Sequence, residues 1–395
     1  MGELGGAVFY SDRACSPRRT LERLRPHFEA LGITRLARQT GLDTVGIPCF
    51  SAIRPNAKTL AVSQGKGLDD DAAMVSAAME AAELAIAERE IAATWVGPAT
   101  ALNEIGAAWF DPTRLLPFAD EFDLDKPVSW VAGKELFGHK PIFVPRDAIR
   151  LDGVSEELLG VSQNTNGLAS GNSRLEAEFH ALCELVERDA TTSWWLLPPE
   201  RQDARAFRAA SLGDAAVDEL EARVARAGLR LALFDLTTDT GTPTIMALVG
   251  PSRGARYFDI AAGFGTHPVA ARAAVKAITE AAQSRVTAIA GSRDDIAVDE
   301  YDDSPDEAIA RLFEVAPGGV APKGLPAATG VDDGLAFMAR GLKAAGVPSP
   351  VSVPLGGESY GIAVVRLLST ELEDRDANSN WRPGPRAISL LLGVA

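Results

Sequence analysis

Three long segments of the chain carry apolar residues at helical spacing, which places them on one face of a helix. They run from about Asp71 to Ala93, from Leu175 to about Trp195, and from about Val269 to Ala290. Two shorter helices are predicted over Thr20 to Leu31, with Thr20 as the N-cap, and over Ala215 to Ala227. The three long helices are the dominant feature of the pattern.

Short apolar runs between these segments are typical of β-strands separated by turns. The stretch from about Gly97 to Val154 is interrupted by prolines and predicts loops and edge strands, and Gly167 to Asn172 predicts a loop of small residues. The apolar run Ile388 to Ala395 predicts a buried terminal strand. Alternating helices and strands favour an α+β fold with mixed sheets. The remaining predicted strands lie within Leu42 to Ala52, Thr59 to Val62, Val128 to Val131, Ile142 to Val144, Leu229 to Leu236, Thr244 to Val249, Tyr257 to Ala262 and Ile362 to Leu368.

Composition limits the class of protein. With 395 residues, 46% of them hydrophobic and 24% charged, the chain can bury a large core in one to three domains. A net charge of -15 argues against general nucleic-acid binding, which needs clustered Lys and Arg. Three cysteines without close pairing indicate neither a disulfide framework nor a zinc ribbon. We see no long apolar membrane span, and Met1 to Tyr10 does not resemble a signal peptide, so we expect a cytoplasmic enzyme.

Each long helix carries a pair of acidic or amide side chains three residues apart, and that spacing puts both on one face. The pairs are Glu80 with Glu83, Glu184 with Glu187, and Glu280 with Gln283. On the second helix Glu176, His180, Glu184 and Glu187 fall in a stripe about 80° wide, since a helix turns about 100° per residue. A single pair is most simply a solvated acidic face. Three such helices, otherwise rich in Ala and Leu, favour a site for Mg²⁺ and the phosphates of a nucleotide.

Other features of the second helix leave questions open. Glu178 projects among the apolar positions and needs a partner, and the like charges of the stripe need a cation from outside the helix. A Walker A loop is not present around Gly65 to Gly67, so a nucleotide would bind in another way. The Gly167 to Asn172 segment suits either a phosphate at a helix N-terminus or an ordinary helix cap.

The string from Asn166 to Asn172, followed by Glu176 and by Glu184 to Ala190, resembles the central signature of the YcaO family. The resemblance extends over roughly residues 10 to 390. It implies a single catalytic domain spanning residues 1 to 395, in which the three long helices converge on an ATP and Mg²⁺ site. It also implies activation of a peptide backbone amide by phosphorylation. Further matching segments are Gly65 to Gly67, Ser76 with Glu80 and Glu83, Gly263 to Gly265, and Thr279 to Arg285.

Carried over residue by residue, the resemblance assigns three sets of residues. Two positions depart from it, because the family commonly has arginine where this chain has Leu84 and Lys276, although Lys276 stays a candidate for cofactor binding. Arg13 and Thr20 rest on a looser match than the others. The implied metal ligands are Glu80, Glu83, Glu176, Glu184, Glu187 and Gln283; the implied nucleotide contacts are Ser76, Asn172, Arg188, Glu280, Lys276, Arg13 and Thr20; and the implied catalytic residues are Arg188, Glu187 and Glu184.

The segments Thr40 to Pro48 and Gly291 to Asp295 resemble the branch of the family that is encoded beside TfuA proteins and is linked to thioamide formation. The resemblance therefore implies a peptide or protein substrate, a TfuA-like partner and a homodimer. A separate leader-binding domain is not apparent. Two alternatives remain: an azoline- or amidine-forming cyclodehydratase, disfavoured by the ending Trp381 to Arg386, and a non-catalytic accessory protein, motivated by Leu84 and Lys276.

Several other conspicuous residues are expected to be structural. His180 and His267 are more simply packed or hydrogen-bonded than catalytic. Cys183 is more simply buried than a sulfur carrier, and Trp194 with Trp195 is more simply packed than part of a peptide-binding wall.

Overall fold

A computed structural model describes residues 12–117, 120–153, 159–251, 259–291, 306–376 and 378–393. The chain divides into two compact units, each described by itself: unit 1 holds Met1–Ala81 and Leu197–Met338, and unit 2 holds Ala82–Leu196 and Ala339–Ala395. The predicted single domain stays a prediction. The Met1 to Tyr10 segment and most of the Gly291 to Asp295 segment lie outside the described residues.

Unit 1 begins with helix α2 (Pro17–Leu24) and the short helix η1 (Arg25–His27). The helix starts earlier than predicted: Ser16 is its N-cap, and the Ser16 Oγ accepts a hydrogen bond from the Arg19 N–H at 3.4 Å. Thr20 as N-cap was therefore wrong, because Pro17 fits the first helical position and shifts the start of the helix. The buried Thr20 hydroxyl instead donates to the Ser16 carbonyl.

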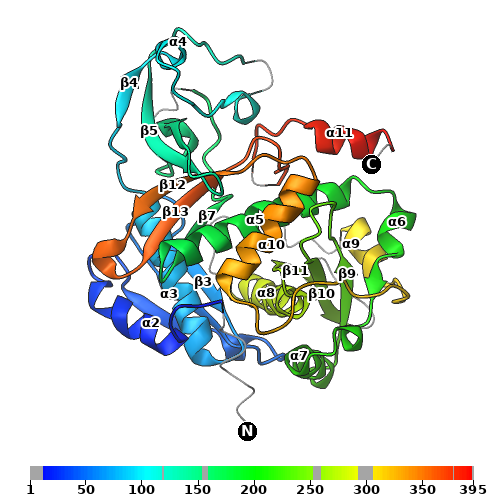
Figure 1. The fold of residues 1–395 in the computed structure, drawn as a ribbon. Coiled ribbons are helices and arrows are strands. Elements are labelled where there is room, and N and C mark those ends of the chain that lie inside the picture. Colours follow the sequence, from blue (N-terminus) through cyan, green and yellow to red (C-terminus); the bar gives the residue numbers. More distant parts are fainter. Residues whose placement is uncertain are drawn as a thin grey trace. The chain divides into compact units, whose positions relative to one another are not determined.

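Two three-stranded antiparallel arrangements, each followed by a long helix, form most of unit 1. The first consists of β1 (Arg35–Arg38), β2 (Cys49–Ile53), β3 (Val62–Lys66) and α3 (Asp70–Ala87). The second consists of β9 (Leu229–Asp235), β10 (Thr244–Pro251), β11 (Ala261–Thr266) and α8 (Ala270–Ala290), with β8 (Ala206–Phe207) added beside β9. Figure 1 shows α8 lying against β10 and β11. The remaining elements of unit 1 are η2 (Thr40–Leu42), α6 (Pro199–Asp203), η5 (Ala209–Leu212), α7 (Ala215–Arg226) and α9 (Glu307–Phe313).

Glycines on the strands let these helices approach the sheets closely. A Cβ atom added at Gly65 would lie 2.1 Å from the Ala77 nitrogen of α3, and one at Gly265 would lie 2.2 Å from the Ala273 oxygen of α8. Both distances are too short for any side chain, so only glycine permits this packing. The faces of α3 and α8 that meet these glycines are rich in alanine, whose small side chains also allow the helix backbone to lie close to the strand.

Unit 2 is built on a six-stranded sheet covered by α5 (Arg174–Trp195). The strand order is β4 (Trp95–Gly97), β5 (Val128–Glu135), β12 (Val351–Gly356), β13 (Ala363–Leu368) and β7 (Leu168–Gly171), and β6 (Pro141–Pro145) pairs with β5. Helix α5 packs on β7 and β13 (Figure 1). The predicted loop Gly167 to Asn172 is thus largely strand β7, because it pairs with β13, whose sequence position gave no local signal. The other elements of unit 2 are α4 (Ala99–Glu104), η3 (Thr113–Leu115), η4 (Arg146–Ala148) and η8 (Glu358–Tyr360). Two helices span the division between the units: α3, whose residues from Ala82 onward belong to unit 2, and α10 (Val331–Ala344).

The C-terminal segment forms a helix instead of the predicted strand. Helix α11 (Pro385–Leu391) buries Ala387, while Leu391 and Leu392 are 58% and 71% exposed. Pro385 at the first helical position favours this start, and so short an apolar run has no periodicity that separates strand from helix.

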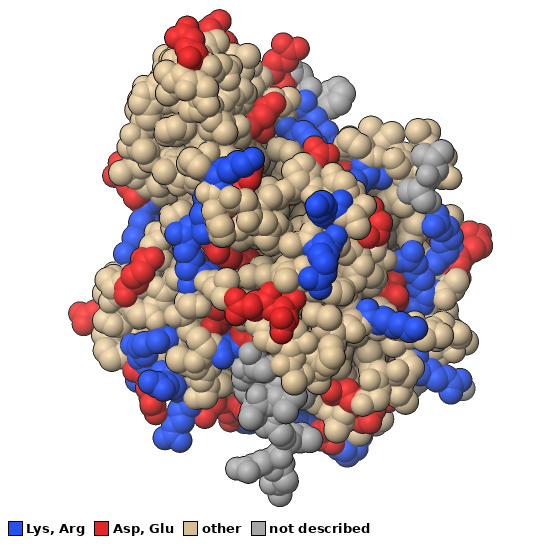
Figure 2. Space-filling model, viewed as in Figure 1, with Lys and Arg blue, Asp and Glu red and all other residues tan. Residues whose placement is uncertain are grey.

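The predicted fold class is confirmed: the chain is α+β with several sheets, and the three long helices are α3, α5 and α8. None of the helices within the described residues is long and apolar enough to cross a membrane. On the face displayed in Figure 2, Lys and Arg side chains are interspersed with Asp and Glu side chains.

Candidate nucleotide and metal site

The N-terminal turn of α5 orders the first residues of the predicted site. Ser173 caps the helix, with its Oγ accepting a hydrogen bond from the Glu176 N–H at 3.2 Å. The buried Glu176 carboxylate accepts from Asn172 Nδ2 at 3.0 and 3.1 Å to its two oxygens. One amide nitrogen is thus shared between both oxygens, which restricts the rotamer of the carboxylate. The structure therefore brings together Asn172 and Glu176, which the sequence assigned to the nucleotide and to the metal.

The later part of the stripe combines acids with one arginine from the same helix. Glu184, Glu187 and Arg188 are all half-buried, and Arg188 Nη2 lies 3.9 Å from Glu184 Oε1. At this distance the pair is a loose one.

The cation that the acidic stripe needs from outside the helix is Arg366 of β13. Its side chain is buried, and its guanidinium donates to the Asn164 carbonyl oxygen at 2.6 Å and to Asn164 Oδ1 at 2.9 Å. Desolvation lowers the pKa of Arg366 to about 10, although the carboxylates of Glu184, Asp374 and Glu83 raise it. The group thus stays charged at neutral pH and offsets carboxylates of α3 and α5. Sequence analysis missed Arg366, because only strand pairing places it beside α5.

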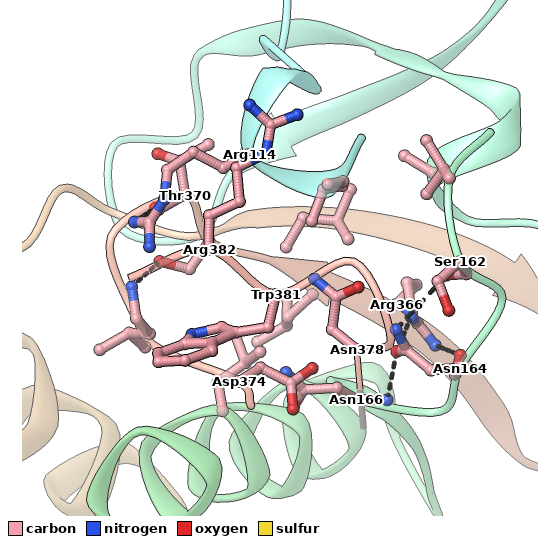
Figure 3. A pocket seen from close by; sticks show the side chains of 18 residues that line it. Arg114, Ser162, Asn164, Asn166, Arg366, Thr370, Asp374, Asn378, Trp381 and Arg382 are labelled. Carbon is pink, nitrogen blue, oxygen red and sulfur yellow. Dashed lines mark hydrogen bonds between the residues drawn. The ribbon is translucent and has the colours of Figure 1, made fainter. Parts of the chain in front are cut away.

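Arg366 also lines a small cavity of about 50 Å³ within unit 2 (Figure 3). Asn164 and Asn166 line it from the segment before β7, and Asn378 and Trp381 line it from the C-terminal segment. The Asn164 Oδ1 accepts the Asn166 backbone N–H at 3.0 Å, as well as the bond from Arg366. This network holds the start of the family-like signature against the last strand of the sheet.

Glu178, which the helical pattern could not place, has three partners in unit 2. Its carboxylate accepts from the Ser352 hydroxyl at 2.8 Å and from Arg174 Nε at 3.0 Å, and Lys134 Nζ lies 3.6 Å away. Burial of this carboxylate is thereby compensated by hydrogen bonds and positive charge. Glu178 anchors α5 to the sheet and has no need of a ligand.

In unit 1 two of the predicted residues accept backbone hydrogen bonds from the strands beneath them. Glu80 Oε1 accepts from the Gln64 N–H at 3.4 Å, and Glu280 Oε1 accepts from the Phe264 N–H at 3.2 Å. Glu280 Oε2 also lies 2.7 Å from Lys66 Nζ. Both glutamates are half-buried and held on the faces of α3 and α8 that pack against sheets.

Other predicted residues are placed as follows. Lys276 donates from Nζ to the Thr266 carbonyl oxygen at 3.1 Å. Ser76 and Gln283 are half-buried on α3 and α8, and Arg13 is exposed. Leu84 is buried, so this chain has an apolar core residue at the position where the resemblance expects arginine.

The donor set fits the group that the resemblance implies. Five carboxylates and one amide supply hard oxygen atoms, which suit Mg²⁺, and Asn172 already orients one of the carboxylates. Within the described residues, no group of three or more His, Cys, Asp and Glu side chains is arranged as a preformed metal centre.

The residues expected to be structural are mostly buried and bonded. His267 Nδ1 accepts from the Val269 N–H at 2.9 Å and its Nε2 faces Asp12 Oδ2 at 3.4 Å. Burial lowers the pKa of His267 to about 4, with the Asp12 hydrogen bond opposing this effect, so the imidazole is neutral at pH 7. Cys183 and Trp194 are buried, and His180 packs edge-on to Phe179 with the ring centroids 5.2 Å apart.

Comparisons with known proteins give the family. Residues 64–373 match the family described as YcaO cyclodehydratase, ATP- and Mg²⁺-binding. An uncharacterized protein in the tfuA 3' region of Rhizobium leguminosarum bv. trifolii is 38% identical over 400 residues, which cover 98% of this chain and 95% of that protein.

Two solved structures share the fold. YcaO from Methanopyrus kandleri, bound with AMPPCP and Mg²⁺, has a TM-score of 0.71 at 22% identity, with 94% of this chain and 96% of that chain covered. A heterocyclase in complex with substrate and cofactor has a TM-score of 0.74 at 19% identity, with 92% of this chain covered. The present chain spans 53%, about half, of that heterocyclase. The expected cofactors agree with the family description, and the chain belongs to the YcaO family of ATP- and Mg²⁺-binding proteins.

Proposed function

We propose that this protein uses ATP and Mg²⁺ to activate a peptide backbone amide by phosphorylation, and that sulfide replaces the amide oxygen to give a thioamide. The observation that carries the proposal is the ordered acidic face of α5. There Asn172 holds Glu176, Arg188 lies beside Glu184, and the buried Arg366 supplies the compensating charge. Family membership supports the ATP-dependent part of the proposal. The thioamide part is supported by the Rhizobium relative, which is described as a protein in the tfuA 3' region.

The proposed ligands follow from the donor types. Carboxylates and one amide would hold Mg²⁺, and the nucleotide would contact hydroxyl, amide, basic and acidic side chains around it. Mg²⁺ would neutralise phosphate charge and orient the phosphates toward the amide. The proposed metal ligands are Glu80, Glu83, Glu176, Glu184, Glu187 and Gln283, and the proposed nucleotide contacts are Ser76, Asn172, Arg188, Glu280, Lys276, Arg13 and Thr20.

The reaction balances with ATP and sulfide as co-substrates. Hydrosulfide adds to the amide carbon, and the resulting oxyanion attacks the γ-phosphorus and displaces ADP. The carbon–oxygen bond then breaks with loss of phosphate, and the sulfur loses its proton to give the thioamide. The protein supplies orientation and charge stabilisation, with Arg188 positioned on the same helix face as Glu184 to stabilise charge on the transferred phosphoryl group.

Two alternatives lead to different products. In an azoline- or amidine-forming enzyme the nucleophile belongs to the peptide itself. The solved heterocyclase with the same fold supports this as an alternative. An accessory protein would bind peptide without chemistry. Thioamide formation raises the peptide mass because sulfur replaces oxygen, whereas azoline formation lowers it by the loss of water. A TfuA-like partner, a homodimer and a cytoplasmic location stay predictions.

Calorimetric titration of MgATP tests the nucleotide site. We compare the wild type with the Glu184→Gln, Glu187→Gln double variant, which keeps the shape of both side chains. Glu178→Gln is the matched control, because it removes a carboxylate from the same helix but from the face bound to Ser352. We expect the double variant to lose binding and the control to retain it at reduced stability. Absence of binding to the folded wild type in the presence of Mg²⁺ would contradict the proposal and favour the accessory function.

A mass-spectrometric assay with candidate peptides, ATP and sulfide then separates the products. Candidates come from genes adjacent to the one for this protein, with and without a TfuA-like protein. An increase in peptide mass that requires sulfide supports thioamide formation. A decrease without sulfide supports cyclisation.

A further inference from the structure

Unit 1 contains the same arrangement twice. In each copy three consecutive antiparallel strands, β1-β2-β3 or β9-β10-β11, lead into a long helix, α3 or α8, and the second sheet has β8 as a fourth strand. In each copy three residues separate the last strand from the helix, since Lys66 ends β3 and Asp70 begins α3, and Thr266 ends β11 and Ala270 begins α8. The end of the last strand and the start of the helix correspond in the two copies at one shift in residue number, 266 − 66 = 270 − 70 = 200.

The sequence supports the equivalence at the close contacts. Gly65 and Gly265 occupy the same place, since a Cβ at either would collide with the backbone of the helix that follows, at Ala73 and Ala77 in one copy and at Ala273 and Ala277 in the other. Identical residues at the common shift include Gly65, Ala73, Val75, Ala77, Glu80, Ala81 and Ala82, which correspond to Gly265, Ala273, Val275, Ala277, Glu280, Ala281 and Ala282. A shared fold with shared contacts indicates an internal repeat.

Glu80 and Glu280 are equivalent in this repeat in structure as well as in sequence. Each accepts a hydrogen bond through Oε1 from the backbone N–H of the last strand, from Gln64 at 3.4 Å and from Phe264 at 3.2 Å. The strand amide therefore sets the orientation of the carboxylate in both copies.

The two copies nevertheless differ in their charged residues at equivalent positions. Lys66 of the first copy reaches Glu280 of the second, with Nζ 2.7 Å from Oε2, while the position equivalent to Lys66 is the neutral Thr266. The second member of each helical pair, three residues after Glu80 or Glu280, is the anionic Glu83 in the first copy and the neutral Gln283 in the second. The first pair thus supplies two carboxylates. The second pair supplies one carboxylate already bonded to an ammonium group.

We propose that Lys66 is a positioning residue: its ammonium group holds the Glu280 carboxylate in place and offsets its charge. Glu280 then accepts hydrogen bonds from the nucleotide, and Mg²⁺ binds to the acidic pair of the first copy, Glu80 and Glu83. The inference rests on the proposed function and deepens it. A carboxylate bonded to Lys attracts Mg²⁺ weakly, because the ammonium group repels the cation over the same few ångströms. The same carboxylate keeps lone pairs that can accept from neutral N–H and O–H groups.

The partial exposure of the pair limits the size of the effect. The Lys66 and Glu280 side chains are 23% and 32% exposed, so solvent screens part of the interaction. We therefore expect Lys66→Met to weaken ADP binding about tenfold, which corresponds to the loss of one charge-assisted hydrogen bond. Lys66→Arg keeps the charge and is expected to restore most of the affinity.

The test measures ADP affinity by calorimetry and Mn²⁺ affinity by paramagnetic resonance on the full chain, with thermal unfolding as the measure of stability. Lys66→Met is expected to bind ADP more weakly and Mn²⁺ more tightly in the absence of nucleotide, because Glu280 loses the ammonium group that repels the cation. Arg38→Met is the matched control, since it removes the exposed Arg38–Asp70 pair of the same copy. We expect it to change neither affinity.

A double-variant cycle shows whether Lys66 acts through Glu280. In a Glu280→Gln background, Lys66→Met should have no further effect on ADP affinity. Additive effects, or unchanged affinities for ADP and Mn²⁺ in folded Lys66→Met, would contradict the inference while leaving the proposed function intact. Failure of the wild type to bind ADP would instead contradict the proposed function itself.

Discussion

Gly265 lies at the closest approach of strand β11 to helix α8, and replacing it with alanine tests whether this packing supports the candidate site. The added Cβ would lie 2.2 Å from the Ala273 oxygen and 2.7 Å from the Ala277 nitrogen. Ordinary contacts begin at 3.4 Å, so the helix and strand must separate by roughly 3.4 − 2.2 = 1.2 Å. The colliding atoms belong to the helix backbone and cannot turn away as a side chain could.

The expected cost follows from overpacking. Forced backbone shifts cost up to about 3 kcal/mol, whereas alanine regains up to about 1 kcal/mol by restricting the unfolded chain. The net loss is about 2 kcal/mol, which lowers the unfolding midpoint by roughly 4–8 °C in a domain of 150–250 residues. The same separation would stretch the 3.2 Å hydrogen bond from the Phe264 N–H to Glu280, so ADP affinity should fall as well.

Thermal unfolding and calorimetric ADP binding measure the two effects. Gly41→Ala is the matched control, because no atom lies within 4 Å of a Cβ there. The control should unfold at the wild-type temperature or up to about 2–4 °C above it, since it creates no contact and alanine restricts the unfolded chain. If Gly265→Ala were as stable as Gly41→Ala, the close packing of β11 on α8 and its support of Glu280 would both be refuted.

Two further predictions concern groups outside the acidic helices. His267 is held neutral by burial with a pKa of about 4, below its usual value of 6.5, so the unfolded chain takes up the proton first as the pH falls. Stability should therefore decrease by about 2 kcal/mol between pH 7 and pH 5, and urea midpoints should show a weaker decrease for His267→Gln; equal slopes would contradict this. Arg386 donates to Asp189 from Nε at 3.0 Å and from Nη2 at 2.8 Å, and the Asp189 side chain is fully buried. Arg386→Ala should cost about 3–5 kcal/mol in urea unfolding, because it leaves a buried charge, whereas Arg18→Ala in an exposed pair should cost less than about 1 kcal/mol; similar losses would refute the anchoring role.

Two of the three long helices could be predicted almost to the residue, whereas the first was expected to run to Ala93 and ends at Ala87. The second was expected from Leu175 to Trp195 and is found from Arg174 to Trp195, and the third was expected from Val269 to Ala290 and is found from Ala270 to Ala290. Their apolar and acidic positions repeat with the period of a helix, so residues close to one another in the sequence are enough to predict each helix. The N-cap of α2 and the end of the chain were wrong because one proline in each case, Pro17 and Pro385, favoured a helix start that the apolar pattern did not mark.

The internal repeat was not visible in the sequence. Its copies share mainly alanine and glycine, which are common in this chain, and only the matching sheets and the backbone hydrogen bonds to Glu80 and Glu280 show the equivalence. Strand pairing between distant segments carries this information, and sequence periodicity does not.

The sequence by itself determined the fold class, the family and the acidic faces of the helices, because these depend on local spacing and on motifs of consecutive residues. Only the tertiary structure decided which charges compensate those acids. Arg366 reaches the α5 stripe through the pairing of β13 with β7, Lys66 reaches Glu280 from another strand, and Ser352 and Lys134 satisfy Glu178. Each of these partner residues lies far from its acid in the sequence. Burial of a carboxylate requires a hydrogen-bond donor or a positive charge nearby, but it does not specify which residue supplies it.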